Sequence, residues 1–172
     1  MFHQFDPSLG TLTSVELILS GSFSTTITVT NTNALGSSST GTAQTEVQLS
    51  AQDAGLNLNT PELDLVSPTF PYSLAPGGST TSGLITKSGT DDETYSAAGV
   101  LSEFTGLGSY VLPASTFTQT LLANTGGNTT ASQVTTAALT GTVTYTYAVP
   151  EPGSLSLLGL AGLGVLRRRR RA

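Results

Sequence analysis

Apolar residues alternate with hydroxyl-bearing residues along most of the first 150 positions. In 11–19, Val15, Leu17 and Leu19 occupy every second position, and the same spacing continues through 22–32. The intervening positions are mainly Ser and Thr, and β-branched side chains suit a pleated, half-buried surface. A period of two over these lengths predicts β-strands with one buried and one solvated face.

The same reading predicts further strands, separated by segments rich in Gly, Asn and Pro. The expected strands are 42–51, 83–88, 115–122 and 134–149. The expected loops and turns are 31–41, 76–78, 89–93 and 124–128, with 124–128 the best hairpin-type turn. Residues 93–100 fit a strand or a helix, and 101–108 read as a connection. About eight short strands without a long helical period predict an all-β fold, an antiparallel, jelly-roll-like β-sandwich.

The pattern changes at residue 149, so we divide the chain into a body (1–148) and a tail (149–172). The tail opens with Val149, Pro150, Glu151 and Pro152. Each proline fixes its φ angle, lacks an N–H donor and pushes the preceding residue toward an extended conformation. This segment is therefore predicted to stay extended and accessible, as a protease substrate or as a simple linker.

A short apolar run and a basic cluster complete the tail. The run from Leu155 to Leu166 predicts a C-terminal hydrophobic helix of about 18 Å, shorter than the roughly 30 Å core of a bilayer. A marginal membrane anchor is the expectation; a buried core helix is the alternative, but it explains neither the prolines nor the arginines. The predicted anchor residues are Leu155, Leu157, Leu158, Leu160, Leu163, Val165 and Leu166. The predicted basic stop is Arg167, Arg168, Arg169, Arg170 and Arg171, which lipid retains on the cytoplasmic side.

The order of these three parts resembles the PEP-CTERM sorting signal of Gram-negative bacteria. In that family an exosortase, an integral-membrane cysteine protease or transpeptidase, recognises the tail and is thought to cut near the Pro-Glu-Pro motif. The resemblance implies export, transient inner-membrane anchoring and a final place on the cell surface or in the extracellular matrix. It also implies an association with exopolysaccharide and biofilm.

Charge excludes one class of partner. The body holds ten acidic residues against Lys87 alone, a net charge of −9, while the tail carries five of the six basic residues. Such a body is not expected to bind nucleic acid through phosphates, and it repels anionic polymers at low salt. The chain has no cysteine, which excludes disulfides and thiolate chemistry.

The first residues, 1–7, contain no basic segment and no apolar run of the kind found in a signal peptide. Because the tail requires export, we expect the reading frame to begin upstream.

The body has a resemblance of its own. Residues 5–12 (FDPSLGTL), followed by Val15, Leu17 and Leu19, and the closing TVTYTY at 142–147 resemble choice-of-anchor E domains. Members of that family carry a further strand before the Phe-Asp-Pro element. The resemblance therefore implies a missing strand and an unpaired sheet edge. Asp6-Pro7 with Gly10 reads as a turn in its own right.

Acidic residues are the only candidates for metal binding. Asp91, Asp92 and Glu93 form the densest group and weakly indicate Ca²⁺, against a solvated turn as the simpler interpretation. A second, weaker set of oxygen ligands is Asp53, Asn57 and Asn59. Neither set of oxygen ligands implies a cofactor other than Ca²⁺.

Catalytic residues are few. His3 is the single histidine and lies at the N-terminus, a poor platform for a triad. Carboxylate chemistry of the glycosidase kind is a third hypothesis. Its candidates are Glu46, Asp64, Glu93 and Glu103. Asn128 fits a glycosylation pattern but reads as a turn residue. We expect a non-enzymatic surface protein, with a Ca²⁺-assisted carbohydrate-binding module as the alternative.

Overall fold

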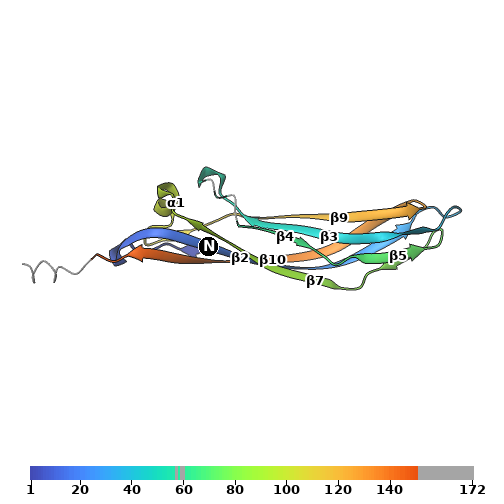
Figure 1. Ribbon diagram of the computed structural model, residues 1–172, viewed down its shortest axis with the longest axis horizontal. Helices are drawn as coiled ribbons and strands as arrows, with labels where there is room; N and C mark the ends of the chain where they lie inside the picture. The colour runs from blue at the N-terminus through green and yellow to red at the C-terminus, as the bar shows by residue number, and fades with distance from the viewer. Residues whose placement is uncertain (57, 59–60, 151–172) are drawn as a thin grey trace, which may run out of the picture.

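The computed structural model describes residues 1–56, 58 and 61–150. In this part of the chain two antiparallel sheets pack face to face as an elongated sandwich (Figure 1). In the first sheet, β2 (Thr11–Asn31) pairs with β10 (Thr129–Ala148), β6 (Ser79–Thr81) and β7 (Ile85–Tyr95). In the second sheet, β3 (Ser39–Ala51) pairs with β9 (Ala114–Gly126), β4 (Glu62–Val66) and β5 (Phe70–Leu74).

The register places the strands on the two sides of each central strand. Because β10 pairs along the whole of β2, the shorter β6 and β7 share the opposite edge of β2. Likewise β9 follows the whole of β3, and β4 and β5 share the other edge. The sandwich therefore has one long side made by β9 and β10, and an opposite side that includes β4 and β7. The predicted all-β antiparallel sandwich is confirmed.

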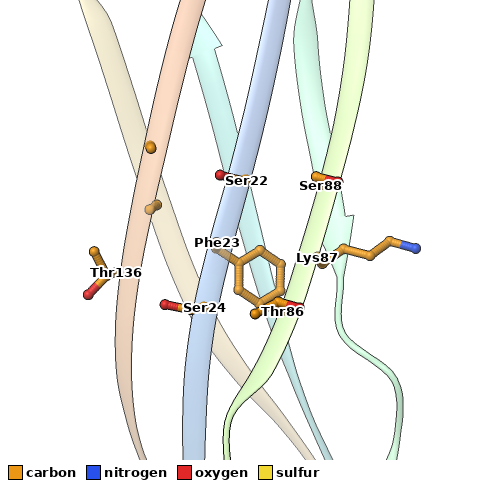
Figure 2. A pocket seen from close by; sticks show the side chains of 9 residues that line it. Ser22, Phe23, Ser24, Thr86, Lys87, Ser88 and Thr136 are labelled. Carbon is orange, nitrogen blue, oxygen red and sulfur yellow. The ribbon is translucent and has the colours of Figure 1, made fainter.

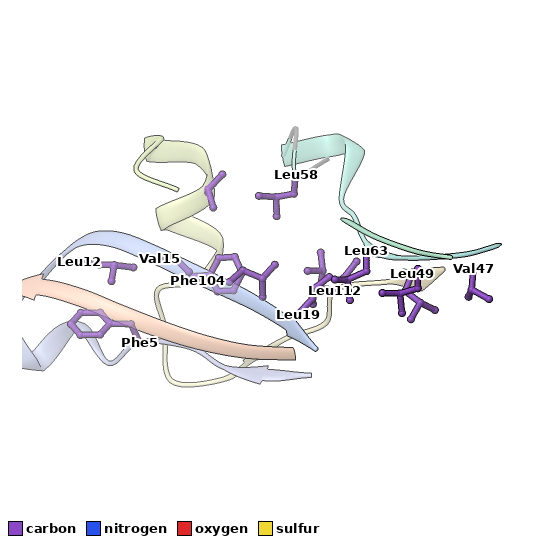
Figure 3. Close-up of a cluster of buried hydrophobic side chains, with 14 of the residues drawn as sticks. Phe5, Leu12, Val15, Leu19, Val47, Leu49, Leu58, Leu63, Phe104 and Leu112 are labelled. Atoms are coloured by element: carbon purple, nitrogen blue, oxygen red, sulfur yellow. The ribbon is translucent and has the colours of Figure 1, made fainter. Parts of the chain in front are cut away.

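Shorter elements close one end of the sandwich. They are β1 (Phe2–His3), which pairs with β8 (Ser109–Tyr110), the 3₁₀ turns η1 (Pro7–Leu9) and η2 (Ala54–Leu56), and the helix α1 (Ala98–Glu103). Since β2 is longer than β3, its first half extends beyond the second sheet and is covered by α1 and the segments around it (Figures 1 and 3). Phe104, at the end of α1, is 1% exposed and packs on Tyr110 with the ring centroids 4.6 Å apart.

The core follows the period of two in the sequence. Odd-numbered residues of β2, among them Val15, Leu17 and Leu19, are buried in one cluster that also contains Val47 and Leu49 of β3. Figure 3 shows how this cluster continues beneath α1. A second, smaller cluster lies toward the other end and contains Ile27, Val29, Ala43, Tyr72 and Leu74. Alternation fixes which face of each strand is buried because successive side chains point to opposite faces.

A layer of hydroxyl groups lies within the sandwich, between Phe23 and Ile27 along β2. Thr25 and Thr45 are both 0% exposed. The Thr25 Oγ1 lies 2.8 Å from that of Thr135 and 3.3 Å from that of Thr45, and the Thr45 hydroxyl donates to Gln133 Oε1 at 2.7 Å. Each hydroxyl can therefore donate to the next group in the series Thr135, Thr25, Thr45 and Gln133. Every buried hydroxyl of this layer then has a hydrogen-bond partner.

Three expectations from the sequence need correction. Residues 89–93 are not a loop but lie inside β7, which continues to Tyr95. The ambiguous 93–100 divides between the end of β7 and the start of α1, and 101–108 includes the rest of that helix. Of the predicted turn at 124–128, residues 124–126 belong to β9 and only 127–128 lie between strands. This connection is no paired hairpin, because β9 pairs with β3 and β10 with β2, so it crosses between the sheets.

Candidate functional site

The body ends at a well-defined junction. The last pair of the first sheet is Ala148 opposite Thr11, and a register shift precedes it between Thr146 and Tyr147. Val149 follows with 66% of its surface exposed. Pro150, also exposed, has no N–H to continue the ladder. The first two residues of the predicted sorting motif therefore leave the sheet at its edge, in an accessible position.

Two local features hold this junction. The Asp6 carboxylate caps η1 by accepting from the Ser8 amide at 2.8 Å, and its contacts with Ser8 hold the pKa of Asp6 below its usual value. Gly10 follows with φ of +151°, and a Cβ built on it would lie 2.3 Å from the Ala148 carbonyl oxygen. The predicted turn is confirmed, and a residue without a side chain lets the two strand ends approach.

The remaining tail residues of the prediction lie outside the described residues. They are Glu151, Pro152, the anchor leucines and valine, and Arg167 to Arg171. Within the described part of the chain, no helix has the length and the apolar character needed to cross a membrane.

A second candidate is a shallow groove on the outer face of the first sheet. Its main part has a volume of about 700 Å³ and crosses three neighbouring strands, β10, β2 and β7 (Figure 2). A smaller part of about 380 Å³ continues along the same strands. The register places the outward residues in rows, which are Thr136–Ser24–Thr86, Ala138–Ser22–Ser88 and Thr140–Ser20–Thr90.

The groove is lined almost entirely by small hydroxyl-bearing and methyl side chains. Lys87 is the one charged residue in its lining, and Figure 2 shows that its amine extends away from β2. Phe23 is 3% exposed, so its ring belongs to the core and offers no stacking surface. Hydroxyls both donate and accept hydrogen bonds. The lining can therefore form hydrogen bonds with a neutral polar chain.

The sequence reading missed this groove, although a signal was present. The outward positions of β2 from Ser20 to Thr30 are all Ser or Thr, as are most of those in β10. Because these residues share the outward face of their strands, they predict a surface covered with hydroxyl groups. What the sequence does not reveal is that β10 and β7 place matching rows beside it.

The acidic candidates for metal binding do not converge. In β7 the pleat turns Asp91 and Glu93 toward one face and Asp92 toward the other. The Asp91 Oδ2 accepts from the Glu62 amide at 3.0 Å and so links β7 to β4. Among the described residues there is no group of three His, Cys, Asp or Glu side chains placed to bind a metal ion.

Asp53, of the second weak set, has a structural role. Its Oδ2 accepts from the Tyr110 hydroxyl at 2.6 Å, and its Oδ1 accepts from the Gly55 amide at 2.9 Å. The contact with Tyr110 lowers the pKa of Asp53, whereas burial, together with this hydrogen bond, raises the pKa of Tyr110. Asn57 and Asn59, the other members of the set, lie outside the described residues.

The carboxylates considered for glycoside hydrolysis are spread over separate elements. Glu46 and Asp64 share the outer face of the second sheet as diagonal neighbours, and the Glu46 Oε2 accepts from Gln119 at 2.7 Å. Glu93 lies in β7 of the first sheet and Glu103 in α1.

The two remaining polar candidates lie in local structure. The backbone of His3 belongs to the small β1–β8 pair, and its carbonyl accepts from the Tyr145 hydroxyl. The carbonyl of Asn128 accepts from the Thr32 amide at 2.7 Å, as expected of a turn residue.

Comparison with known families assigns the tail. Residues 148–171 match the PEP-CTERM protein-sorting motif. No curated protein and no solved structure matches the chain significantly. The motif supports an exported protein that is processed by an exosortase, associates transiently with the membrane through its C-terminus, and ends on the cell surface or outside the cell. It begins at Ala148, the residue at which β10 ends.

Proposed function

We propose that this chain is a non-enzymatic surface or matrix protein, delivered through residues 149–172 and associated with exopolysaccharide. The observation that carries the proposal is the coincidence of two boundaries: the sorting motif begins where the last strand ends. Cleavage in the motif then removes the tail and leaves every strand of the sandwich in place.

The delivery step can be tested in the producing bacterium. In cells with the exosortase, the mature protein is expected in the surface or medium fraction, with a C-terminus near 150–152 by mass spectrometry. A variant with both Pro150 and Pro152 changed to Ala is expected to accumulate uncut in the membrane fraction. Pro76→Ala, in an exposed turn away from the tail, is the control and should be processed normally. A full chain ending at Ala172 in the cytosol would refute the proposal.

The exopolysaccharide part of the proposal rests on the hydroxyl-lined groove. Its lining matches the hydrogen-bonding groups of a sugar chain, and the net charge of −9 on the body disfavours acidic polymers at low salt. We therefore propose a neutral polysaccharide as the ligand class.

A matched pair of variants tests the groove. Ser22→Leu fills its centre, whereas Ser73→Leu adds the same bulk to an exposed position of β5 in the other sheet. The probe is the neutral polysaccharide fraction purified from the producing cells, and binding is followed by co-sedimentation. Ser22→Leu should weaken binding at least about tenfold, or about 1.4 kcal/mol, with Ser73→Leu unchanged. Equal binding by both variants would remove the groove from the proposal and leave the delivery step untouched.

The non-enzymatic part is supported by the separation of the candidate carboxylates. A glycosidase needs two carboxyl groups facing the same bond. Here Glu46 and Asp64 are diagonal neighbours, but Glu46 is engaged by Gln119, and Glu93 and Glu103 belong to other elements. Turnover of matrix glycans that is lost in Glu46→Gln or Asp64→Asn would contradict this part and favour the hydrolase alternative.

A further inference from the structure

The two long sides of the sandwich differ in charge. The side opposite β9 and β10 carries six charged residues on two strands, which are Glu62, Asp64, Lys87, Asp91, Asp92 and Glu93. By contrast, the chain has no charged residue between Glu103 and Glu151, a stretch that contains all of β9 and β10. Six of the eleven charged residues of the body therefore lie on β4 and β7, and none lies on β9 or β10.

The uncharged side also has two free strand edges. Among the described strands, β9 pairs only with β3, and β10 pairs only with β2. Natural sheets protect such edges with lysines, prolines or bulges. Neither β9 nor β10 contains a lysine or a proline, and the one register shift in β10 lies at its end, between Thr146 and Tyr147.

Apolar side chains are exposed on the outer faces of these two edge strands. Phe117 of β9 is 55% exposed, and Val134 of β10 is 78% exposed. An opening of about 140 Å³ between the two edges reaches Leu49 and Leu139 of the core. The two edge strands thus carry no charge, have unpaired backbone edges and expose apolar side chains. This combination is typical of a surface that another strand covers.

We propose that a second copy of this chain covers it, with β10 pairing antiparallel to its own copy across a twofold axis. Like-charged bodies repel when their acidic sides meet, so approach through the uncharged sides is the arrangement with the least repulsion. A twofold contact of this type extends the first sheet of one copy into the first sheet of the other.

The register of the pairing follows from the part of β10 that is free. Toward its C-terminal end, β10 is covered by the N-terminal segment, where Phe5 packs on Tyr145 and Tyr147. The open stretch is 129–140. Its centre is Val134, the most exposed apolar residue of the strand, and a twofold axis there places each Val134 opposite its copy.

The available area is sufficient for a dimer. Twelve residues at about 3.3 Å each give a contact roughly 40 Å long, and two stacked sheets with their side chains are roughly 20 Å thick. The product is about 800 Å² on each partner, which is the size of a standard stable interface.

Cross-linking tests the proposal because the chain has no cysteine of its own. The full chain is kept in a mild detergent that shields the tail and is treated with a short thiol–thiol cross-linker. Val134→Cys should give a covalent dimer in high yield. Thr86→Cys, an exposed position of β7 on the charged side of the same sheet, is the matched control and should give little covalent dimer. Equal yields from both variants, or no dimer with Val134→Cys, would overturn the proposal.

A charge variant provides an independent readout. Val134→Lys places a charge at the centre of the proposed contact, and Thr86→Lys places the same charge on the other side. In sedimentation velocity at micromolar concentration, the dimer should dissociate at least about tenfold more readily with Val134→Lys only, equivalent to about 1.4 kcal/mol. A wild-type chain that is monomeric at about 100 μM, where a pairing of this size should be detectable, would also refute the inference.

Discussion

At the scale of single residues, the buried hydroxyl layer explains why threonine occurs at inward positions of the central strands. Thr25 and Thr45 lie on faces that are otherwise apolar, yet both are fully buried. They are tolerated because Thr135 and Gln133 of β10 complete their hydrogen bonds. The cost of burying a hydroxyl is recovered only when its partner is present.

This pairing predicts the effect of a nearly isosteric change. Thr45→Val keeps the shape of the side chain but leaves the Gln133 Oε1 and the Thr25 hydroxyl without this partner. The free energy of unfolding should fall by about 1–3 kcal/mol in urea denaturation. Thr42→Val, on the outward face of the same strand, should change it by less than about 0.5 kcal/mol. Equal effects of the two substitutions would show that the hydroxyl network contributes nothing.

At the scale of elements, the sequence predicted strands better than it predicted their limits and partners. The alternation in 42–51 correctly predicted a strand, and Ala43, Thr45, Val47 and Leu49 are buried on one face of it. The acidic run at 91–93 was read as a loop because Asp and Glu have low strand propensity. In the fold these residues pair with 17–19 of β2, and long-range pairing of this type overrides local preference.

The junction between body and tail could be predicted in part. The prolines indicated where the strand must stop, and Val149 and Pro150 are indeed exposed. The role of Gly10 could not be predicted beyond a turn, because its neighbour Ala148 is 138 positions away in the sequence. A contact between the first and last strands of the first sheet depends on the topology and leaves no local signal.

The last turn before β2 therefore controls the end of β10. Gly10→Ala places a methyl group against the Ala148 carbonyl at a positive φ, and the free energy of unfolding should fall by roughly 1–3 kcal/mol. Limited proteolysis should also become faster near Ala148, because the final pair with Thr11 is weakened.

The control is Gly99→Ala in α1. A Cβ at Gly99 has no neighbour within 4 Å, so this substitution should leave stability unchanged or raise it by up to about 1 kcal/mol. If proteolysis near Ala148 were as slow in Gly10→Ala as in Gly99→Ala, the close approach would have no consequence for the junction.

At the scale of the whole molecule, alternation and turn residues were sufficient to predict a two-layer antiparallel sandwich. They were not sufficient to predict that 11–31 forms one continuous strand, or that α1 covers the part of it beyond the second sheet. Coverage at that end depends on Phe104, whose burial follows from contacts with Tyr110 and Tyr145. Tyr145 is 41 positions from Phe104, and no periodic pattern connects the three residues.

The same end of the molecule predicts a dependence of stability on alkaline pH. Burial and the hydrogen bond to Asp53 raise the pKa of Tyr110 above its ordinary value of 10.0, so the folded state binds this proton more tightly than the unfolded state does. Stability is then retained below pH 10 and lost as the pH rises above it. Tyr110→Phe has no such proton to lose, so its melting temperature should decline less steeply above about pH 10. If the melting temperatures of the two proteins declined equally steeply above about pH 10, the assignment of this pH dependence to Tyr110 would be wrong.

The pairing of the first and last long strands also determines how the molecule is presented outside the cell. The tail leaves from the α1 end of the long axis, while the turns at 32–38 and 127–128 lie at the other end (Figure 1). At about 3.3 Å per strand residue, those turns lie roughly 60 Å from Ala148, after which the sorting tail begins. The reach of the body from its point of attachment is set by the length of β2 and β10, and lengthening the two strands together would move the outermost turns farther from that point.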